Sequence, residues 1–170
     1  MDCTLIHFIM RFKILTLFTL ATLFISCKKD KSTLPPVINV SVQLADNSAV
    51  NNAVISLLDA NHATVATATS GSDGKIAFTA TANNTYYLYN NLADSKIIAD
   101  PDATYFITGT FTSQQQINNS PVQTPAAKIG DNVYLDINGD GAINYYDLVK
   151  KVTAPAAGSS TNVKLIMEAH

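Results

Sequence analysis

The residues best suited to chemistry lie close together near the end of the chain, between positions 136 and 147. If residue 136 is numbered 1, side chains that carry oxygen fall at positions 1, 3, 5, 9 and 12 of this loop: Asp136, Asn138, Asp140, Asn144 and Asp147. Gly141 stands at position 6, where the chain must turn sharply, and Ala142 at position 7 can offer its backbone carbonyl. Because Ca²⁺ takes six to eight oxygen ligands at about 2.3–2.6 Å, this spacing predicts a calcium site.

Closure of such a loop brings together carboxylates that repel one another. Like charges that share one site disfavour the ionised form of each, and a bound cation removes that penalty. The ion and the folded loop are therefore expected to depend on each other. Ile143 at position 8 is expected to point inward and attach the loop to the core. An aspartate-rich turn that binds no ion is the alternative.

The spacing resembles the EF-hand calcium loop, in the dockerin-like form that has aspartate at position 12. The resemblance implies that six residues hold Ca²⁺: Asp136, Asn138, Asp140, Ala142, Asn144 and Asp147. Dockerins proper carry two such loops, each followed by a helix, and bind cohesin domains. The other aspartate-containing stretches, 70–75 and 94–102, lack a second array of this kind. We therefore interpret the loop as one that stabilises a β-domain, with a docking module as the alternative.

Other polar and aromatic residues are weaker candidates for a site. Asp100 and Asp102 flank a proline and predict a turn, because a catalytic acid–base pair needs two distinct environments. His62 stands between two expected strands and predicts a solvated turn. Five aromatic residues could form a platform for a sugar ring, although their alternation favours core packing: Tyr86, Tyr87, Tyr89, Tyr105 and Phe106.

Composition excludes several classes of function once an expected export signal is set aside. Removal of residues 1–26 leaves 144 residues with 9 basic and 12 acidic side chains, a net charge of −3, and no arginine. Such a chain is poorly suited to bind nucleic acid or to clamp phosphate groups. Cys27 and Glu168 are then the only cysteine and glutamate, so most hydrolytic and redox chemistries lack their residues. We therefore predict a non-catalytic protein.

The beginning of the chain has the pattern of an export signal. Arg11 and Lys13 precede an apolar run over residues 14–25, which is shorter than the roughly 20 residues of a transmembrane helix. We predict a signal peptide over residues 1–26 that truly starts at Met10. An earlier start would place apolar residues ahead of the positive charges, where signal peptides do not have them.

Residues 23–27, Leu-Phe-Ile-Ser-Cys, resemble the lipobox of bacterial lipoproteins, in which the cysteine is lipidated. The Lys-Lys-Asp-Lys sequence that follows is similar to the tails of lipoproteins from Bacteroidetes-type bacteria. The resemblance implies that Cys27 carries acyl chains, that residues 27–36 tether the domain, and that the protein lies at the outer membrane or cell surface. Each buried CH₂ contributes about 0.8 kcal/mol, so several acyl chains make a stable anchor. An ordinary signal peptide with a chance cysteine is the alternative.

From residue 37 onward, short alternating runs are separated by turn residues, a pattern typical of a β-sandwich. Strands are expected at 37–44, 53–58, 63–69, 76–82, 85–90, 104–112, 132–137 and 162–168. Polar loops are expected at 91–103 and 113–128, and a short helical turn at 144–151. The predicted fold class is mainly β, with one domain over residues 37–170 and an inserted calcium loop at 136–147.

Residues 37–90 resemble the transthyretin-like and carboxypeptidase-regulatory β-sandwiches of secreted bacterial proteins. The similarity lies in Ala53 to Asp59, Thr69 to Phe78 and Tyr86 to Tyr89, and it implies a fold but no activity. We expect a calcium-stabilised binding or structural lipoprotein, accessory to glycan uptake or adhesion, whose partner is a glycan or a protein. The alternative is a dockerin-type assembly module that binds a protein through the calcium loop and its helix.

Overall fold

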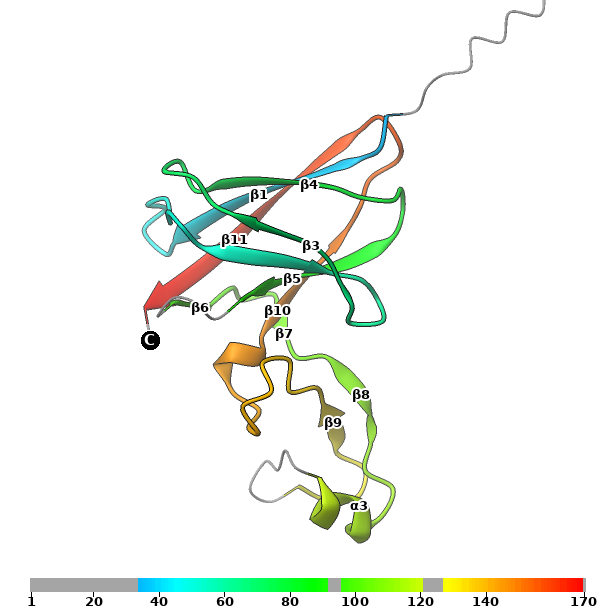
Figure 1. Ribbon diagram of the computed structural model, residues 1–170. Helices are drawn as coiled ribbons and strands as arrows, with labels where there is room; N and C mark the ends of the chain where they lie inside the picture. The colour runs from blue at the N-terminus through cyan, green and yellow to red at the C-terminus, as the bar shows by residue number, and fades with distance from the viewer. Residues whose placement is uncertain (1–33, 92–95, 121–126, 170) are drawn as a thin grey trace, which may run out of the picture. The chain divides into compact units, whose positions relative to one another are not determined.

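The computed structural model describes residues 34–91, 96–120 and 127–169, and this part of the chain is mainly β (Figure 1). One sheet has the strand order β4-β1-β11-β6, a second has the order β3-β2-β5-β10-β7, and a two-stranded sheet pairs β8 with β9. The strands are β1 (Val37–Leu44), β2 (Val54–Leu58), β3 (Thr64–Thr69), β4 (Lys75–Thr79), β5 (Thr85–Asn90), β6 (Lys96–Ile98), β7 (Ala103–Thr104), β8 (Ile107–Thr110), β9 (Asn132–Tyr134), β10 (Val149–Thr153) and β11 (Ser160–Ala169). The helical elements are α3 (Gln114–Asn119) and the 3₁₀ turn η1 (Tyr145–Asp147).

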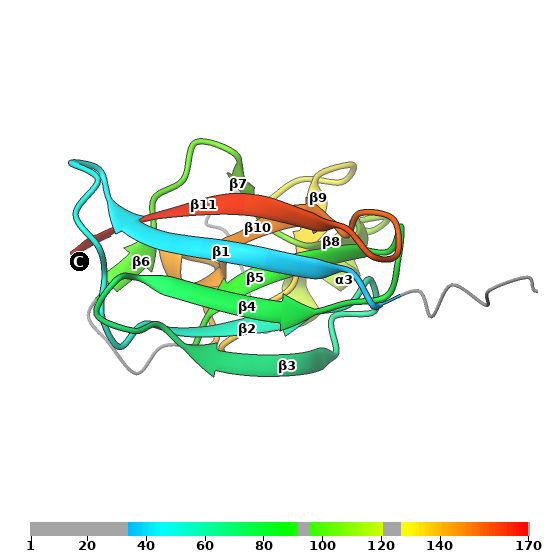
Figure 2. The same ribbon diagram turned by 90° about the horizontal axis from the view of Figure 1, so that it is seen from above.

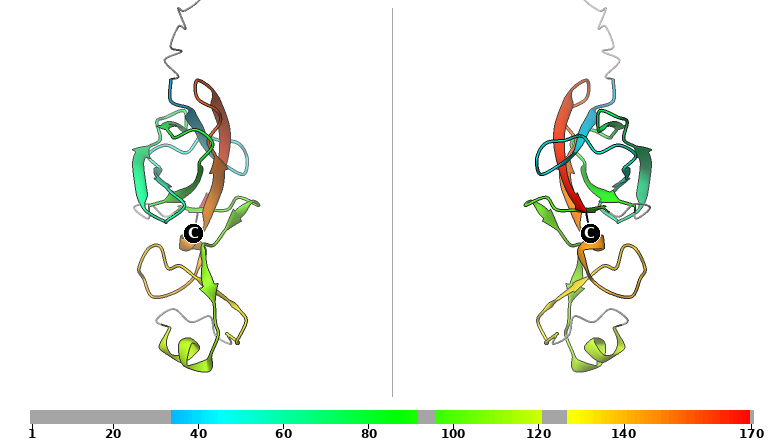
Figure 3. Two further views of the ribbon diagram at one scale, coloured as in Figure 1. Left: turned by 90° about the vertical axis from the view of Figure 1, so that its right-hand side faces the viewer. Right: turned by 90° about the vertical axis from the view of Figure 1, so that its left-hand side faces the viewer.

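The two larger sheets enclose one hydrophobic core. In β1, Ile38 and Val42 are buried while the alternate residues are half-exposed, as expected for a strand with one face on a core. This strand pairs in parallel with β11 and antiparallel with β4, and Figures 2 and 3 show these strands as one layer beside the other sheet. Both sheets contribute to the core, the first through Leu165 and the second through Leu57 and Leu88. A mainly β, sandwich-like fold is therefore confirmed.

The expected single strand at 104–112 is wrong, because the chain leaves the larger sheets within it. β7 pairs with β10, whereas β8 pairs with β9. Between them Phe106 is buried in a smaller group of core residues, which we call the second cluster: Leu58, Tyr89, Phe106 and Val149. Burial of Phe106 interrupts the strand at this point.

The expected polar, exposed loop at 113–128 contains the helix α3. Ser113 is its N-cap residue, and the Ser113 Oγ accepts a hydrogen bond from Gln116 N at 3.3 Å. Serine is favoured at this position because its oxygen satisfies one of the free amides of the first turn. Ile117 is the buried residue of the helix, so this segment has apolar packing of its own.

Three further expectations are corrected by non-local packing. The expected loop at 91–103 contains β6, which pairs with β11. The expected helical turn at 144–151 is only η1, and the strand β10 follows it and lies between β5 and β7. The expected strand at 132–137 is only β9, because Leu135 and Ile137 pack against the second cluster instead of extending a sheet.

The expected signal peptide over residues 1–26, the lipidated Cys27 and most of the tether at 27–36 lie outside the described residues. Within the described ranges, no helix combines the length and the apolar character that crossing a membrane requires.

Candidate metal centre

Both ends of the 136–147 loop are attached to the second cluster. Leu135, directly before the loop, donates from its backbone N to Phe106 O at 3.0 Å. Leu135 and Ile137 then pack against the cluster, and Val149, shortly after the loop, is a buried member of it. The cluster lies on the face of β5 that carries Tyr89, opposite the face whose Leu88 enters the main core. The loop is therefore fixed to the outer face of the second sheet.

Asp136, at position 1, closes the first half of the loop. Its Oδ1 accepts from Gly139 N at 2.7 Å, and its Oδ2 accepts from Gly141 N at 2.8 Å. Both glycines have positive φ angles, 72° and 85°, in the left-handed region that glycine adopts without a steric penalty. The sharp turn expected at Gly141 is confirmed, and Gly139 adds a second turn that the spacing argument did not include.

The side chains at positions 3, 5 and 9 converge on one oxygen atom. Asp140 Oδ2 accepts from Asn138 Nδ2 at 2.9 Å and from Asn144 Nδ2 at 3.0 Å. The other oxygen of Asp140 accepts from Ala142 N at 2.8 Å. The hydrogen bonds from the Asn144 and Asn138 side chains, and then the one from Ala142, lower the pKa of Asp140 below its usual value. Three of the expected ligand positions thus meet at one point.

Asp147, at position 12, has a different environment because it is fully buried. Its Oδ1 accepts from Ile137 N and its Oδ2 from Asn144 N, both at 2.9 Å. The Asn144 Oδ1 in turn accepts from Tyr146 N at 2.8 Å, so the two side chains form a reciprocal cap on η1. Burial, with a smaller contribution from the charge of Asp136, raises the pKa of Asp147, and its backbone donors act against that shift.

The three carboxylates act on a common neighbour, Tyr89 of β5. Burial, followed by the negative charges of Asp147, Asp136 and Asp140, raises the pKa of Tyr89 to about 12. A phenol resists ionisation when negative charges already surround it. The sequence did not indicate that Tyr89 lies near the loop, because Tyr89 belongs to β5, which is distant from the loop along the chain.

The oxygen atoms of the loop are the type of ligand that a hard cation binds. The carboxylates of the loop, however, already accept hydrogen bonds from other groups of the protein. All expected side-chain ligands offer oxygen, the donor that Ca²⁺ prefers, and none is a thiol or an imidazole. Within the described part of the chain, no three aspartate, glutamate, histidine or cysteine side chains lie close enough to form a metal-binding group. The oxygens of Asp136 and Asp147 point instead to backbone amides.

The remaining loop residues take up simpler positions. Ala142 is exposed, and its backbone N is the donor to Asp140 described above. Ile143, expected to attach the loop to the core, is half-buried, and it is Ile137 that packs against the second cluster.

Asp100 and Asp102 form a turn, as expected, but Asp100 is also part of a buried ion pair. The Ala103 backbone N donates to Asp100 O at 2.9 Å, which closes the turn. The Asp100 Oδ1 lies 2.6 Å from Lys150 Nζ, and the two side chains are 2% and 14% exposed. Asp102 is the outer partner, with its Oδ2 3.5 Å from the same ammonium group. The sequence did not indicate this pairing, because Lys150 is 50 residues away.

The other single candidates are packing residues. The expectation of a solvated His62 is wrong, because its ring centroid lies 4.2 Å from that of Phe106 and the residue is half-buried. Tyr86 and Tyr89 are buried on opposite faces of β5, which confirms the alternation expected there. Tyr87 contacts Phe106 edge-on at 4.3 Å. These rings therefore do not form one exposed platform.

Comparisons with known proteins leave the chain without an assigned family. No family model matches it, and no curated protein matches it. A solved structure with some similarity is BcpA, the major pilin subunit of Bacillus cereus, with a TM-score of 0.39 and 10% sequence identity. The similarity covers 81% of this chain and 31% of the pilin chain, so this chain spans less than a third of that protein's length.

Proposed function

We propose that the chain is a non-catalytic lipoprotein of the outer membrane or cell surface, in which one EF-hand-type loop binds Ca²⁺ and stabilises a β-domain that binds a glycan or protein partner. The observation that carries the proposal is the closure of the loop. Asp136 holds the amides at positions 4 and 6, and Asp140 draws in the side chains at positions 3 and 9.

The electrostatics of the loop favour a cation. Burial is the largest cause of the raised pKa of Tyr89, and the negative charges of Asp147, Asp136 and Asp140 add to it, so the three carboxylates act on the same part of the second sheet. Asp136, Asn138, Asp140, Ala142, Asn144 and Asp147 are the residues that would hold the ion. Bound Ca²⁺ supplies positive charge that offsets the repulsion among the carboxylates.

The non-catalytic role is supported by what the reactive side chains contact. Asp100 is paired with Lys150, and the His62 ring packs against Phe106, so each of these side chains has a structural contact. The lipid anchor and the membrane location rest on the sequence pattern that ends at Cys27. The transthyretin-like or carboxypeptidase-regulatory assignment rests on the sequence similarity over residues 37–90, and the mainly β fold of this segment supports it.

We favour a stabilising loop over a dockerin-type module for one reason. Docking through such a loop uses the helix that follows it, and here the loop is followed by the three-residue η1 and then by β10. β10 pairs with β5 along its whole length and with β7 at Val149 and Lys150, so the segment after η1 is a strand of the second sheet and not a docking helix.

Calcium titration of the full chain, with thermal melting in calcium and in chelator, tests the proposal. We expect one binding site and a higher melting temperature in millimolar calcium. The double variant Asp136→Ala, Asp140→Ala should abolish both the heat of binding and the calcium-dependent rise in melting temperature, because it removes two of the expected carboxylate ligands.

Asp59→Ala is the matched control. The Asp59 Oδ1 accepts from Asn61 N and Ala63 N, at 2.8 and 3.0 Å, so it caps backbone amides much as Asp136 does but outside the loop. Its loss should lower the melting temperature equally in calcium and in chelator and leave calcium binding intact. An equal destabilisation of the double variant in both conditions would contradict the proposed ion.

A further inference from the structure

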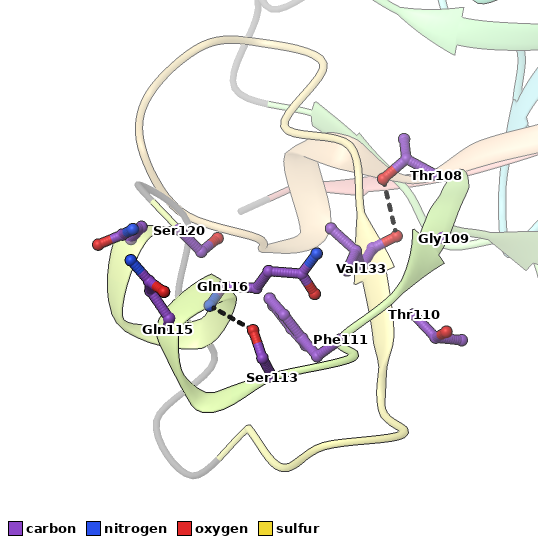
Figure 4. Close-up of a pocket in the computed structure, with 10 residues that line it drawn as sticks. Thr108, Gly109, Thr110, Phe111, Ser113, Gln115, Gln116, Ser120 and Val133 are labelled. Atoms are coloured by element: carbon purple, nitrogen blue, oxygen red, sulfur yellow. Dashed lines mark hydrogen bonds between the residues drawn. The ribbon is translucent and has the colours of Figure 1, made fainter.

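A second candidate site lies away from the calcium loop, between α3 and the β8–β9 sheet (Figure 4). The pocket has a volume of about 530 Å³, which falls within the roughly 300–1,000 Å³ of small-molecule sites. None of the six expected calcium ligands lines it. Its chemistry can therefore be considered separately from that of the ion.

The side chains that line this pocket are uncharged. Among the described residues that line it there is no aspartate, glutamate, histidine, lysine or arginine; the side chains are hydroxyls, amides and a few apolar groups. An ionised ligand would lose part of its hydration there without gaining a compensating charge. The pocket is thus suited to a neutral ligand.

Three polar side chains of the pocket are held by the protein with hydrogen-bonding capacity left over. Gln116 Oε1 accepts from Thr112 N at 2.7 Å and from Thr112 Oγ1 at 2.9 Å, which orients the amide and leaves its NH₂ as a donor. Ser113 Oγ accepts from Gln116 N, so its hydroxyl hydrogen is also a donor. Thr108 Oγ1 donates to Val133 O at 3.1 Å and keeps its lone pairs as acceptors.

An apolar surface adjoins these polar groups. Phe111 and Val133 line the pocket, and Figure 4 shows the Gln116 side chain running from the helix toward them. Gln115, one residue earlier on α3, adds an amide that forms no hydrogen bond with the described residues. A ligand that fits this lining has hydroxyls that both donate and accept, together with an apolar C–H face.

We propose that this pocket binds a neutral saccharide. The inference rests on the proposed function as a binding module and names the ligand class and its site. We favour a saccharide over an extended peptide because the oriented donors and acceptors described above belong to side chains, whereas peptides bound by strand addition are held by backbone hydrogen bonds. Oriented donors and acceptors lower the ordering cost of binding, as preorganisation does elsewhere.

The test is an NMR titration of the full chain, labelled with ¹⁵N, in a detergent that contains no sugar. The probes are maltotriose, cellotriose, xylotriose and chitotriose, with trigalacturonate as a charged counterpart and trialanine as a peptide. We expect at least one neutral trisaccharide to shift the side-chain amide signals of Gln116 and Gln115, with weaker or no shifts from the charged probe and the peptide.

The variants test whether the pocket is the site. Gln116→Leu should weaken binding of that trisaccharide at least tenfold, and Gln115→Ala, which removes no hydrogen bond among the described residues, at least threefold. Gln114→Leu is the matched control: Gln114 Nε2 donates to Asn118 Oδ1 at 2.9 Å outside the pocket, so its loss should leave affinity unchanged. The inference is overturned if no neutral trisaccharide binds, if trialanine or trigalacturonate binds equally well, or if Gln115→Ala and Gln114→Leu behave alike.

The melting temperature of each sample, with calcium and with chelator, separates the two proposals. A calcium-dependent rise without saccharide binding would overturn the saccharide site and leave the calcium loop standing. Saccharide binding without that rise would overturn the calcium loop and leave the saccharide site standing.

Discussion

Asp140 and Asp147 stand at two expected ligand positions, yet the protein surrounds them differently. Asp140 is exposed and accepts hydrogen bonds from two asparagine side chains, whereas Asp147 is buried and accepts from two backbone amides. The residue types and spacing of the loop could be predicted, because they follow from the ligands that Ca²⁺ prefers. Burial of Asp147 beside Tyr89 could not, since it depends on a strand that is distant in sequence.

The two aspartates should respond differently to truncation when calcium is absent. Asp147→Ala leaves the amides of Ile137 and Asn144 without their acceptor, and an unsatisfied buried donor costs about 1–3 kcal/mol. We expect it to lower the free energy of unfolding in chelator by about 2 kcal/mol or more. Asp140→Ala removes exposed hydrogen bonds and should cost about 1 kcal/mol or less.

Urea unfolding in chelator measures these two costs, and calorimetric titration measures calcium binding of the same variants. Both substitutions should abolish binding, because each removes an expected ligand. If the two variants are equally stable in chelator, the structural role of the buried Asp147 carboxylate is contradicted.

Elements whose pattern is local were predictable, and elements that depend on distant partners were not. The observed bounds of β1 are those predicted from the sequence. Apolar and polar residues alternate along this strand, and a strand with one buried face shows this alternation in the sequence itself. β6 has three residues, too few to show any period, and it forms because β11 pairs with it. β10 was missed because its Lys150 is polar on a central strand, where apolar residues are expected.

The ion pair of Lys150 with Asp100 explains how this polar residue is accommodated in β10. Lys150→Met would leave the nearly buried Asp100 carboxylate without its cation, and loss of one partner of a buried pair typically costs about 3–5 kcal/mol. We expect a loss near the lower end, about 3 kcal/mol, because Asp102 N still donates to the Asp100 Oδ1 at 3.0 Å.

Lys151→Met is the control for this prediction, since Lys151 is the next residue on the same strand and is exposed. Urea unfolding at neutral pH should show little change for this variant, as is usual for surface substitutions. Similar losses for both lysine variants would mean that β10 tolerates the Lys150 charge without needing the pair.

Taken as a whole, the described domain has two groups of apolar residues, and the calcium loop contacts only one of them. Leu135 and Ile137 pack against the second cluster, whose Val149 and Tyr89 pair with each other across β10 and β5. β1, β4 and β11 contribute to the main core and have no residue in the second cluster. Local opening of the loop should therefore be coupled to β10 and β5 more strongly than to the other sheet.

Hydrogen exchange followed by mass spectrometry tests this coupling. Calcium should slow exchange most in residues 136–147, less in β10 and β5, and least in β1 and β4, because amides that exchange by local opening report only the stability of their own region. The Asp136→Ala, Asp140→Ala variant should exchange alike with and without calcium. A uniform slowing over all strands would mean instead that the ion stabilises the domain as one cooperative unit, and that the two groups of apolar residues do not unfold separately.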